Sequence, residues 1–260
     1  MLAALLLKAL LTGGIVAVAA VAAGRMGPVW GGLIATLPVS AGPAFALLAL
    51  EHPPAFVAGV AQAALASNVA TALYLFLLVR GLPRLGLLRG MALAIPAWAG
   101  LAALLLWLAP GYGLALGLNA LAYGLAIRGT APALAEGPPV ALRPARWWEL
   151  PLRASLLGLM VASVVSLAGH LGALLTGLGT MFPVALTALT VATVPRMGAV
   201  GTARLLAGAT RGMLGFVAFM AVLAGLAGPM GTLPALGLGV LANLCWGAGV
   251  LLLRRLRRPG

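Results

Sequence analysis

The sequence is poor in acidic residues and has a single cysteine. Among its 260 residues there is no Asp, and the acids are Glu51, Glu136 and Glu149. Only 7% of the residues are charged, whereas a soluble domain carries roughly a quarter. One cysteine cannot form an internal disulfide, which excludes a secreted disulfide scaffold. A soluble enzyme and a disordered tail are excluded too, because both need far more polar and charged residues.

Motifs for metal or covalent catalysis are missing as well. The sequence has no cluster of His, Cys, Asp and Glu with metal-ligand spacing, no His-Glu-x-x-His motif and no glycine-rich phosphate loop. A proton or sodium relay built on buried carboxylates is not expected, because Glu51 is the only acid near an apolar segment. We therefore predict a protein that is not an enzyme and has no metal and no cofactor.

Apolar residues dominate the chain. They make up 63% of it, and the mean hydropathy is +1.15. About 20 apolar residues in a helix span a bilayer core. Nine segments approach this length: Leu5–Ala23, Val29–Leu50, Ala55–Val79, Met91–Ala109, Tyr112–Ile127, Arg153–Gly169, Ala173–Val194, Gly212–Ala227 and Leu233–Leu253. The predicted fold class is an all-α polytopic membrane protein with about nine transmembrane helices, embedded in a lipid bilayer.

Basic residues lie in the short loops between these segments. The net charge is +13, from 16 Lys and Arg. In a soluble protein this would suggest nucleic acid, but here it matches the way membrane proteins orient themselves, so no nucleic acid partner is expected. With the N-terminus outside, 15 of the 16 basic residues fall inside, and Lys8 is the exception. The positive-inside rule therefore predicts an outside N-terminus and a cytoplasmic C-terminus.

The two halves of the chain resemble each other. Offset by 145 residues, Leu7–Val39 aligns with Leu152–Val184 without a gap, and 13 of 33 positions are identical. One extra crossing, Tyr112–Ile127, separates two sets of four helices, so the second copy should be inverted in the membrane. The longest polar stretch, Gly129–Leu150, contains four prolines and is predicted to be a linker. The predicted units are a first four-helix repeat (1–110), a linker helix with a Pro-rich cytoplasmic loop (111–151) and a second four-helix repeat (152–260).

Four short motifs carry a resemblance to a known family. They are Leu5–Leu10 with Lys8, the run Gly31–Pro38, Leu50-Glu51-His52, and Cys245-Trp246-Gly247 in the last helix. In order and spacing they resemble the GlpM-like family, and each half of the chain resembles one whole member. The resemblance implies a bacterial-type inner (plasma) membrane protein, and some members are linked to exopolysaccharide production. The chain departs from the pattern in the second copy, where Arg196 stands opposite Glu51.

Pro38 and Pro183 mark the candidate site. Each occupies the same position in its copy and follows a glycine-rich approach. Proline removes a backbone donor and clashes with the carbonyl four residues back. Paired helix breaks in inverted repeats point to a substrate site near the midplane. The alternative is that these prolines only kink their helices, as proline and glycine commonly do in membranes.

Polar residues of the third and seventh helices are further candidates for substrate binding. Asn68 and Thr71 share one face of the third helix with Ser67. They are either hydrogen-bonded contacts between helices or the lining of a cavity. Thr180 is grouped with them, although the threonines of the seventh helix are expected mostly to bond their own backbone.

Three charged or ionisable residues complete the candidates. If the eighth helix begins near Leu205, Arg211 lies within the membrane and should face a cavity or an anion. If it begins at Gly212, Arg211 is an ordinary interfacial arginine. Glu51 and His52 sit at an outer helix end, where a carboxylate beside an imidazole could gate or relay protons, although a structural role is the alternative.

The predicted function is a small secondary transporter or facilitator with a midplane site between inverted repeats. Its substrate is an unknown small or lipid-like molecule, anionic or phosphate-bearing if Arg211 is buried. The alternative is a non-transporting membrane scaffold or a subunit of an envelope-polysaccharide machine. A polar cavity between the repeats would favour transport, and a dry, filled interface would favour the scaffold. An oligomer is compatible with both.

Overall fold

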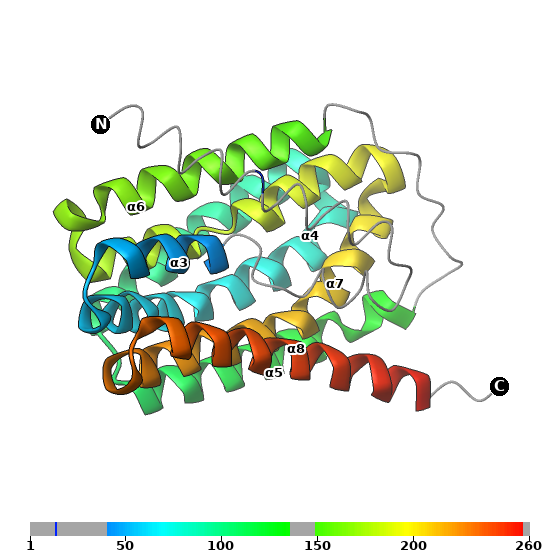
Figure 1. Ribbon diagram of the computed structural model, residues 1–260. Helices are drawn as coiled ribbons and strands as arrows, with labels where there is room; N and C mark the ends of the chain where they lie inside the picture. The colour runs from blue at the N-terminus through cyan, green and yellow to red at the C-terminus, as the bar shows by residue number, and fades with distance from the viewer. Residues whose placement is uncertain (1–13, 15–40, 136–148, 257–260) are drawn as a thin grey trace.

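The computed structural model describes residues 14, 41–135 and 149–256, and within them every regular element is an α-helix (Figure 1). The helices are α3 (Ala41–Glu51), α4 (Pro54–Leu108), α5 (Tyr112–Ala135), α6 (Glu149–Met181), α7 (Val184–Met230) and α8 (Thr232–Leu256). Their long axes run across the view of Figure 1 as one bundle. The all-helical class is confirmed, and the nine crossings stay a prediction.

Three helical stretches are long and apolar enough to cross a membrane: Pro54–Leu108, Gly158–Met230 and Thr232–Val250. The first, of 55 residues, would measure about 80 Å if it were straight, far beyond a bilayer core of about 30 Å. It folds back at Gly86, whose φ of 73° and ψ of −177° are open to glycine without strain. Two antiparallel segments result, 54–85 and 87–108.

The α6–α7 stretch folds back in the same way. Gly172 has φ 71° and ψ 174°, and Gly198 has φ 74° and ψ 171°. These turns leave three segments, 149–171, 173–197 and 199–230, and the middle one is itself broken after Met181. The segments are compatible with a multi-pass membrane protein. α5 is not among the three stretches above, so whether the fifth segment crosses stays open.

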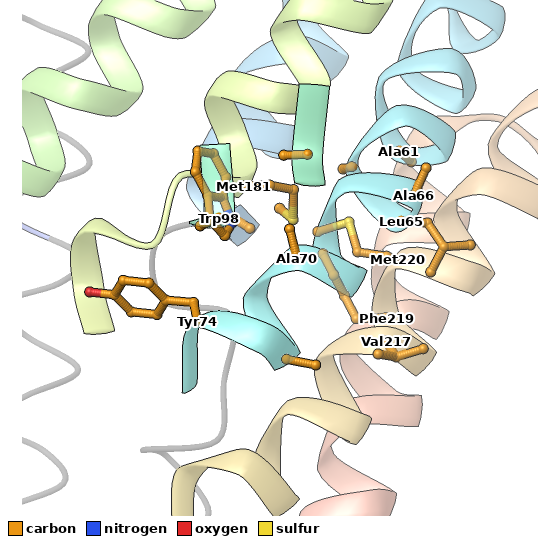
Figure 2. Packing of buried hydrophobic residues seen from close by; sticks show 14 of the residues in the cluster. Ala61, Leu65, Ala66, Ala70, Tyr74, Trp98, Met181, Val217, Phe219 and Met220 are labelled. Carbon is orange, nitrogen blue, oxygen red and sulfur yellow. The ribbon is translucent and has the colours of Figure 1, made fainter. Parts of the chain in front are cut away.

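Large apolar side chains cover the outside of the bundle. Leu50 is 76% exposed, Trp107 79% and Leu88 84%. A soluble monomer rarely exposes so much apolar surface, whereas lipid tails cover it at no cost. The core lies between α4 and α7, which share the most extensive contact in the bundle. Figure 2 shows Leu65, Phe219 and Met220 among the side chains that fill it.

The turns gather at the two ends of the bundle (Figure 1). The turns at 52–53, 109–111, Gly172 and Gly231 lie at the left-hand end, and those at Gly86 and Gly198 lie at the right-hand end. Arginines lie close in sequence to the turns of the right-hand end. Arg80, Arg84 and Arg89 flank the Gly86 turn, and Arg196 and Arg204 flank the Gly198 turn.

Some predicted boundaries were wrong. The linker was predicted to start at Gly129, but α5 continues through Pro132 to Ala135, because a proline in the last turns removes few helical bonds. Arg80–Arg89 was predicted to be a loop, yet it is helical on both sides of Gly86, since one glycine suffices for the turn. The eighth predicted helix begins at Ala199, directly after Gly198, and not at Leu205 or Gly212.

Candidate functional site

The helix between Ala173 and Met197 is interrupted at Phe182–Pro183. α6 ends at Met181 and α7 begins at Val184. Pro183 has no amide hydrogen to donate, and its backbone (φ −78°, ψ 50°) departs from the helical ψ, so the helical hydrogen bonds are interrupted here. The Val184 amide instead donates to the Phe182 carbonyl at 2.7 Å. Helix ends leave backbone N–H and C=O groups without intrahelical partners. The break therefore places such N–H and C=O groups inside an apolar bundle.

The break lies near the middle of its span. From the Gly172 turn to Met181 the helix is about 14 Å long, close to half of a 30 Å bilayer core. Thr180 lies one turn before Pro183, and its hydroxyl donates to the Gly177 carbonyl at 2.8 Å. This backbone bond is the one expected of a threonine in an apolar helix.

Side chains of α4 surround the break. The Trp98 ring meets the Phe182 ring edge to face, with centroids 5.2 Å apart. Its indole nitrogen donates to the Thr71 hydroxyl at 3.3 Å. The Tyr74 and Thr187 hydroxyls are hydrogen-bonded at 2.7 Å, which joins α4 to α7 directly. Figure 2 shows Trp98 and Tyr74 beside the chain where its helical coil is interrupted.

Two predicted site residues, Thr180 and Pro183, therefore lie at the break, and Thr71 is connected to it through the Trp98 side chain. Trp98 and Tyr74 were missed. Both are fully or nearly fully buried, at 4% and 0% exposure. An aromatic side chain with a polar edge in the middle of an apolar helix needs a hydrogen-bond partner, and that signal could have identified them.

Asn68 faces α5 and not the break. Its amide nitrogen donates to the Asn119 side-chain oxygen at 3.1 Å, and the Tyr123 hydroxyl donates to its side-chain oxygen at 3.2 Å. The Asn119 amide also donates to the carbonyls of Leu65 and Ala115, both at 2.8 Å. The three polar side chains are fully buried. Of the two roles left open for Asn68, this geometry is that of a helix contact, and substrate binding by Asn68 stays a prediction.

Arg211 lies about 20 Å along the segment 199–230 from the Gly198 turn. It is half-buried, and the Trp246 indole of α8 donates to its carbonyl at 3.0 Å. This depth is similar to that of the break, because Pro183 precedes the same turn by a comparable length of helix. Its role toward an anion stays a prediction.

The remaining predicted residues lie elsewhere. Glu51 is exposed at the end of α3, and the His52 ring stacks on Phe56 with centroids 4.3 Å apart. Their gating role is untested. Pro38 lies outside the described residues. Within the described ranges, no group of three or more His, Cys, Asp or Glu could hold a metal ion.

A pocket of about 250 Å³ lies beside the turn between α4 and α5. Its walls come from residues 59–66 of α4, from 105–110 at the α4–α5 turn, and from Ala173 and Leu174 of α6. Gln62 is the polar side chain in this wall, and its amide nitrogen donates to the Pro110 carbonyl at 2.9 Å. Both halves of the chain contribute to the pocket.

Comparison of the chain with protein-family models, with curated proteins and with solved structures finds no match. The resemblance to the GlpM-like family therefore stays an expectation.

Proposed function

We propose that the protein is a small secondary transporter or facilitator with its substrate site at the Pro183 break. One observation carries the proposal: the break opens a helix near midspan, and side chains of the other half of the chain surround it. Trp98 and Tyr74 come from the first half, and Phe182 and Thr187 come from the second. Broken helices at such positions bind substrates in transporters built from inverted repeats, because they offer backbone dipoles away from water.

The positions of the turns support the repeat. The break between α3 and α4 at Pro53 and the turn at Gly198 are 145 residues apart, and so are the turns at Gly86 and Gly231. This is the offset at which the sequence aligns with itself. The segments 54–85 and 199–230 are therefore equal in length and begin at equivalent positions. Chain direction supports inversion, because 54–85 runs left to right in Figure 1 and 199–230 runs right to left.

The distribution of charge supports a cytoplasmic C-terminus. The arginines that flank Gly86 and Gly198 lie at one end of the bundle, and the turns at Gly172 and Gly231 at the other end contain no charged residue. By the positive-inside rule the arginine end faces the cytoplasm of a bacterial-type inner membrane. The pocket beside Gln62 then opens outward.

A scaffold is the second candidate, and one observation favours it. The contact between α4 and α7 is filled by apolar side chains, with Leu65, Phe219 and Met220 almost wholly buried. An interface packed in this way leaves little room for the two halves of the chain to rock against each other. The alternative therefore remains a non-transporting subunit of a larger membrane assembly.

Labelling of a single cysteine from both faces separates the two candidates. Thr180→Cys, in a Cys245→Ser background, places a thiol beside the break. In right-side-out and inside-out membrane vesicles, a membrane-impermeant methanethiosulfonate reagent should label it from each face, because alternating access or an open path exposes the site to both. Ala70→Cys is the matched control, since Ala70 is fully buried in the α4–α7 core and should react from neither face. If the reagent labels Thr180→Cys from neither face, the scaffold is favoured.

A further inference from the structure

Among the described residues that line the pocket, Gln62 has the side chain that can form hydrogen bonds, and its bond to Pro110 fixes which way the amide points. The Pro110 carbonyl can only accept a hydrogen bond, so the Gln62 amide must present its nitrogen there. The side-chain oxygen of Gln62 then points away from this bond. Within the part of the chain that the structure describes, no protein group donates to this oxygen, so it is the acceptor that the pocket offers to an occupant.

Other polar atoms of the wall are already engaged. The Leu105 and Leu106 carbonyls accept the Ala109 amide at 3.0 and 3.2 Å. The Ala63 carbonyl accepts the Ser67 hydroxyl at 2.8 Å. None of the described residues that line the pocket is charged. The surface that remains is alanine, leucine, glycine and proline, so an ion would lose its hydration without gaining a partner.

We infer that this pocket binds a neutral, mostly apolar small molecule whose single hydroxyl donates to the Gln62 side-chain oxygen. The inference deepens the proposed function by naming its substrate class, and it rests on that function. The size follows from the volume. A cavity of about 150 Å³ holds one benzene, so 250 Å³ accommodates about ten non-hydrogen atoms. Ligand pockets of this kind are apolar with a few polar groups that fix orientation.

Two helical segments connect the pocket wall with the break. Leu105 lies two turns from Trp98 on the same segment of α4, and therefore on the same face. Leu174 lies two turns from Met181 on α6 in the same way. Both deeper residues are almost fully buried, Trp98 at 4% and Met181 at 5%. The Trp98 ring contacts Phe182 at the break, so the pocket and the break share the same two segments of the chain.

The test measures protection of a thiol in the pocket. Leu174→Cys, in the Cys245→Ser background of the full chain in nanodiscs, is labelled by an impermeant maleimide with and without 4-propylphenol, which has ten non-hydrogen atoms. Leu88→Cys is the control for partition of the probe into lipid, because Leu88 is 84% exposed and lies near the opposite end. We expect at least a fivefold slower reaction at position 174 and no change at position 88.

Further probes and variants test whether the hydroxyl of the ligand is recognised and whether a charged ligand is excluded. Propylbenzene, which lacks the hydroxyl, should protect with about five- to tenfold weaker affinity, and 4-propylbenzoate should not protect. Gln62→Met should remove the preference for the phenol, and Ala66→Leu, which keeps Gln62 and its bond to Pro110, should abolish protection by filling the pocket. Equal protection by phenol and propylbenzene, best protection by the benzoate, or no protection by any probe would each overturn the inference. If Thr180→Cys still reacts from both faces in that case, the proposed function survives and only the substrate class is wrong.

Discussion

Gly177 controls how closely the two halves of the bundle approach, and its replacement by alanine is the sharpest structural test. A Cβ at this position would lie 2.5 Å from the Ala63 Cβ, 2.7 Å from the Val60 carbonyl oxygen and 2.9 Å from the Ala64 amide nitrogen. Non-bonded carbon contacts are comfortable at about 3.5–4.0 Å. Two of the three atoms belong to the backbone of α4, so no rotamer change relieves the clash. The segment 173–181 would have to move away by about 1 Å.

The expected loss of stability follows from two opposing effects. Overpacking of a tight interface costs about 1–3 kcal/mol. Alanine in place of a helical glycine recovers about 0.5–1 kcal/mol. The net expectation for Gly177→Ala is a loss of about 1–2 kcal/mol, or about 2–8 °C in the midpoint of thermal unfolding for a chain of this size.

The assay is thermal unfolding of the purified protein in one detergent, followed by tryptophan fluorescence. Gly100→Ala is the matched control, because Gly100 is exposed on α4 and a Cβ there meets no atom within 4 Å. It should unfold at or slightly above the wild-type temperature. Adding Ala63→Gly to Gly177→Ala should restore stability only in part, since the two backbone contacts remain. If Gly177→Ala is as stable as Gly100→Ala, the close approach of α6 to α4 is wrong.

Three further outcomes are expected. Asn119→Leu should lower the unfolding free energy by about 2–3 kcal/mol, because Asn119 makes three hydrogen bonds and its loss leaves Asn68 without its amide acceptor; an unchanged free energy in detergent unfolding would contradict the network. Asn243→Leu should instead raise the unfolding midpoint by about 2–4 °C, because both amide atoms of Asn243 are buried without a hydrogen-bond partner and leucine has the same branching; a fall in thermal scans would show that the amide has a partner. In vesicles of known orientation, Arg84→Cys should react from the cytoplasmic face and His52→Cys from the outer face, each with Cys245 replaced, and reaction of both from one face would refute the topology.

The break was partly predictable from proline chemistry, whereas the positions of the turns were not. Pro183 has no amide hydrogen, which favours a helix break, but Pro96 and Pro195 lie inside continuous helices, so proline alone does not single out this position. Gly86 and Gly198 are two of 36 glycines, and only their positive φ angles distinguish them from glycines inside helices. The arginines of this region predict a loop, and this prediction was wrong. Arg80 and Arg84 lie in helix α4, and Gly86 alone makes the turn.

The polar contacts were only partly predictable for a different reason. Asn68 could be identified as a polar residue in an apolar helix, but its partners Asn119 and Tyr123 lie on α5, about 50 residues away in the chain. No local pattern in the sequence connects these positions. The outer pocket was invisible too, since its walls are ordinary alanine and leucine apart from Gln62.

The hydrogen bonds that join α4 to α5 differ from those that join α4 to the broken segment. α4 and α5 are connected by Asn68, Asn119 and Tyr123, whose bonds satisfy one another in a fully buried network. Such networks hold their elements in one arrangement, because any displacement leaves several buried groups unpaired at once. Before the break, the segment packs tightly on α4 at Gly177. After the break, the hydrogen bond to α4 among the described residues is the Tyr74–Thr187 bond, and the Trp98 ring contacts Phe182. A single hydroxyl pair can exchange for water or substrate at little cost, so relative motion should concentrate at the break while α5 moves together with α4.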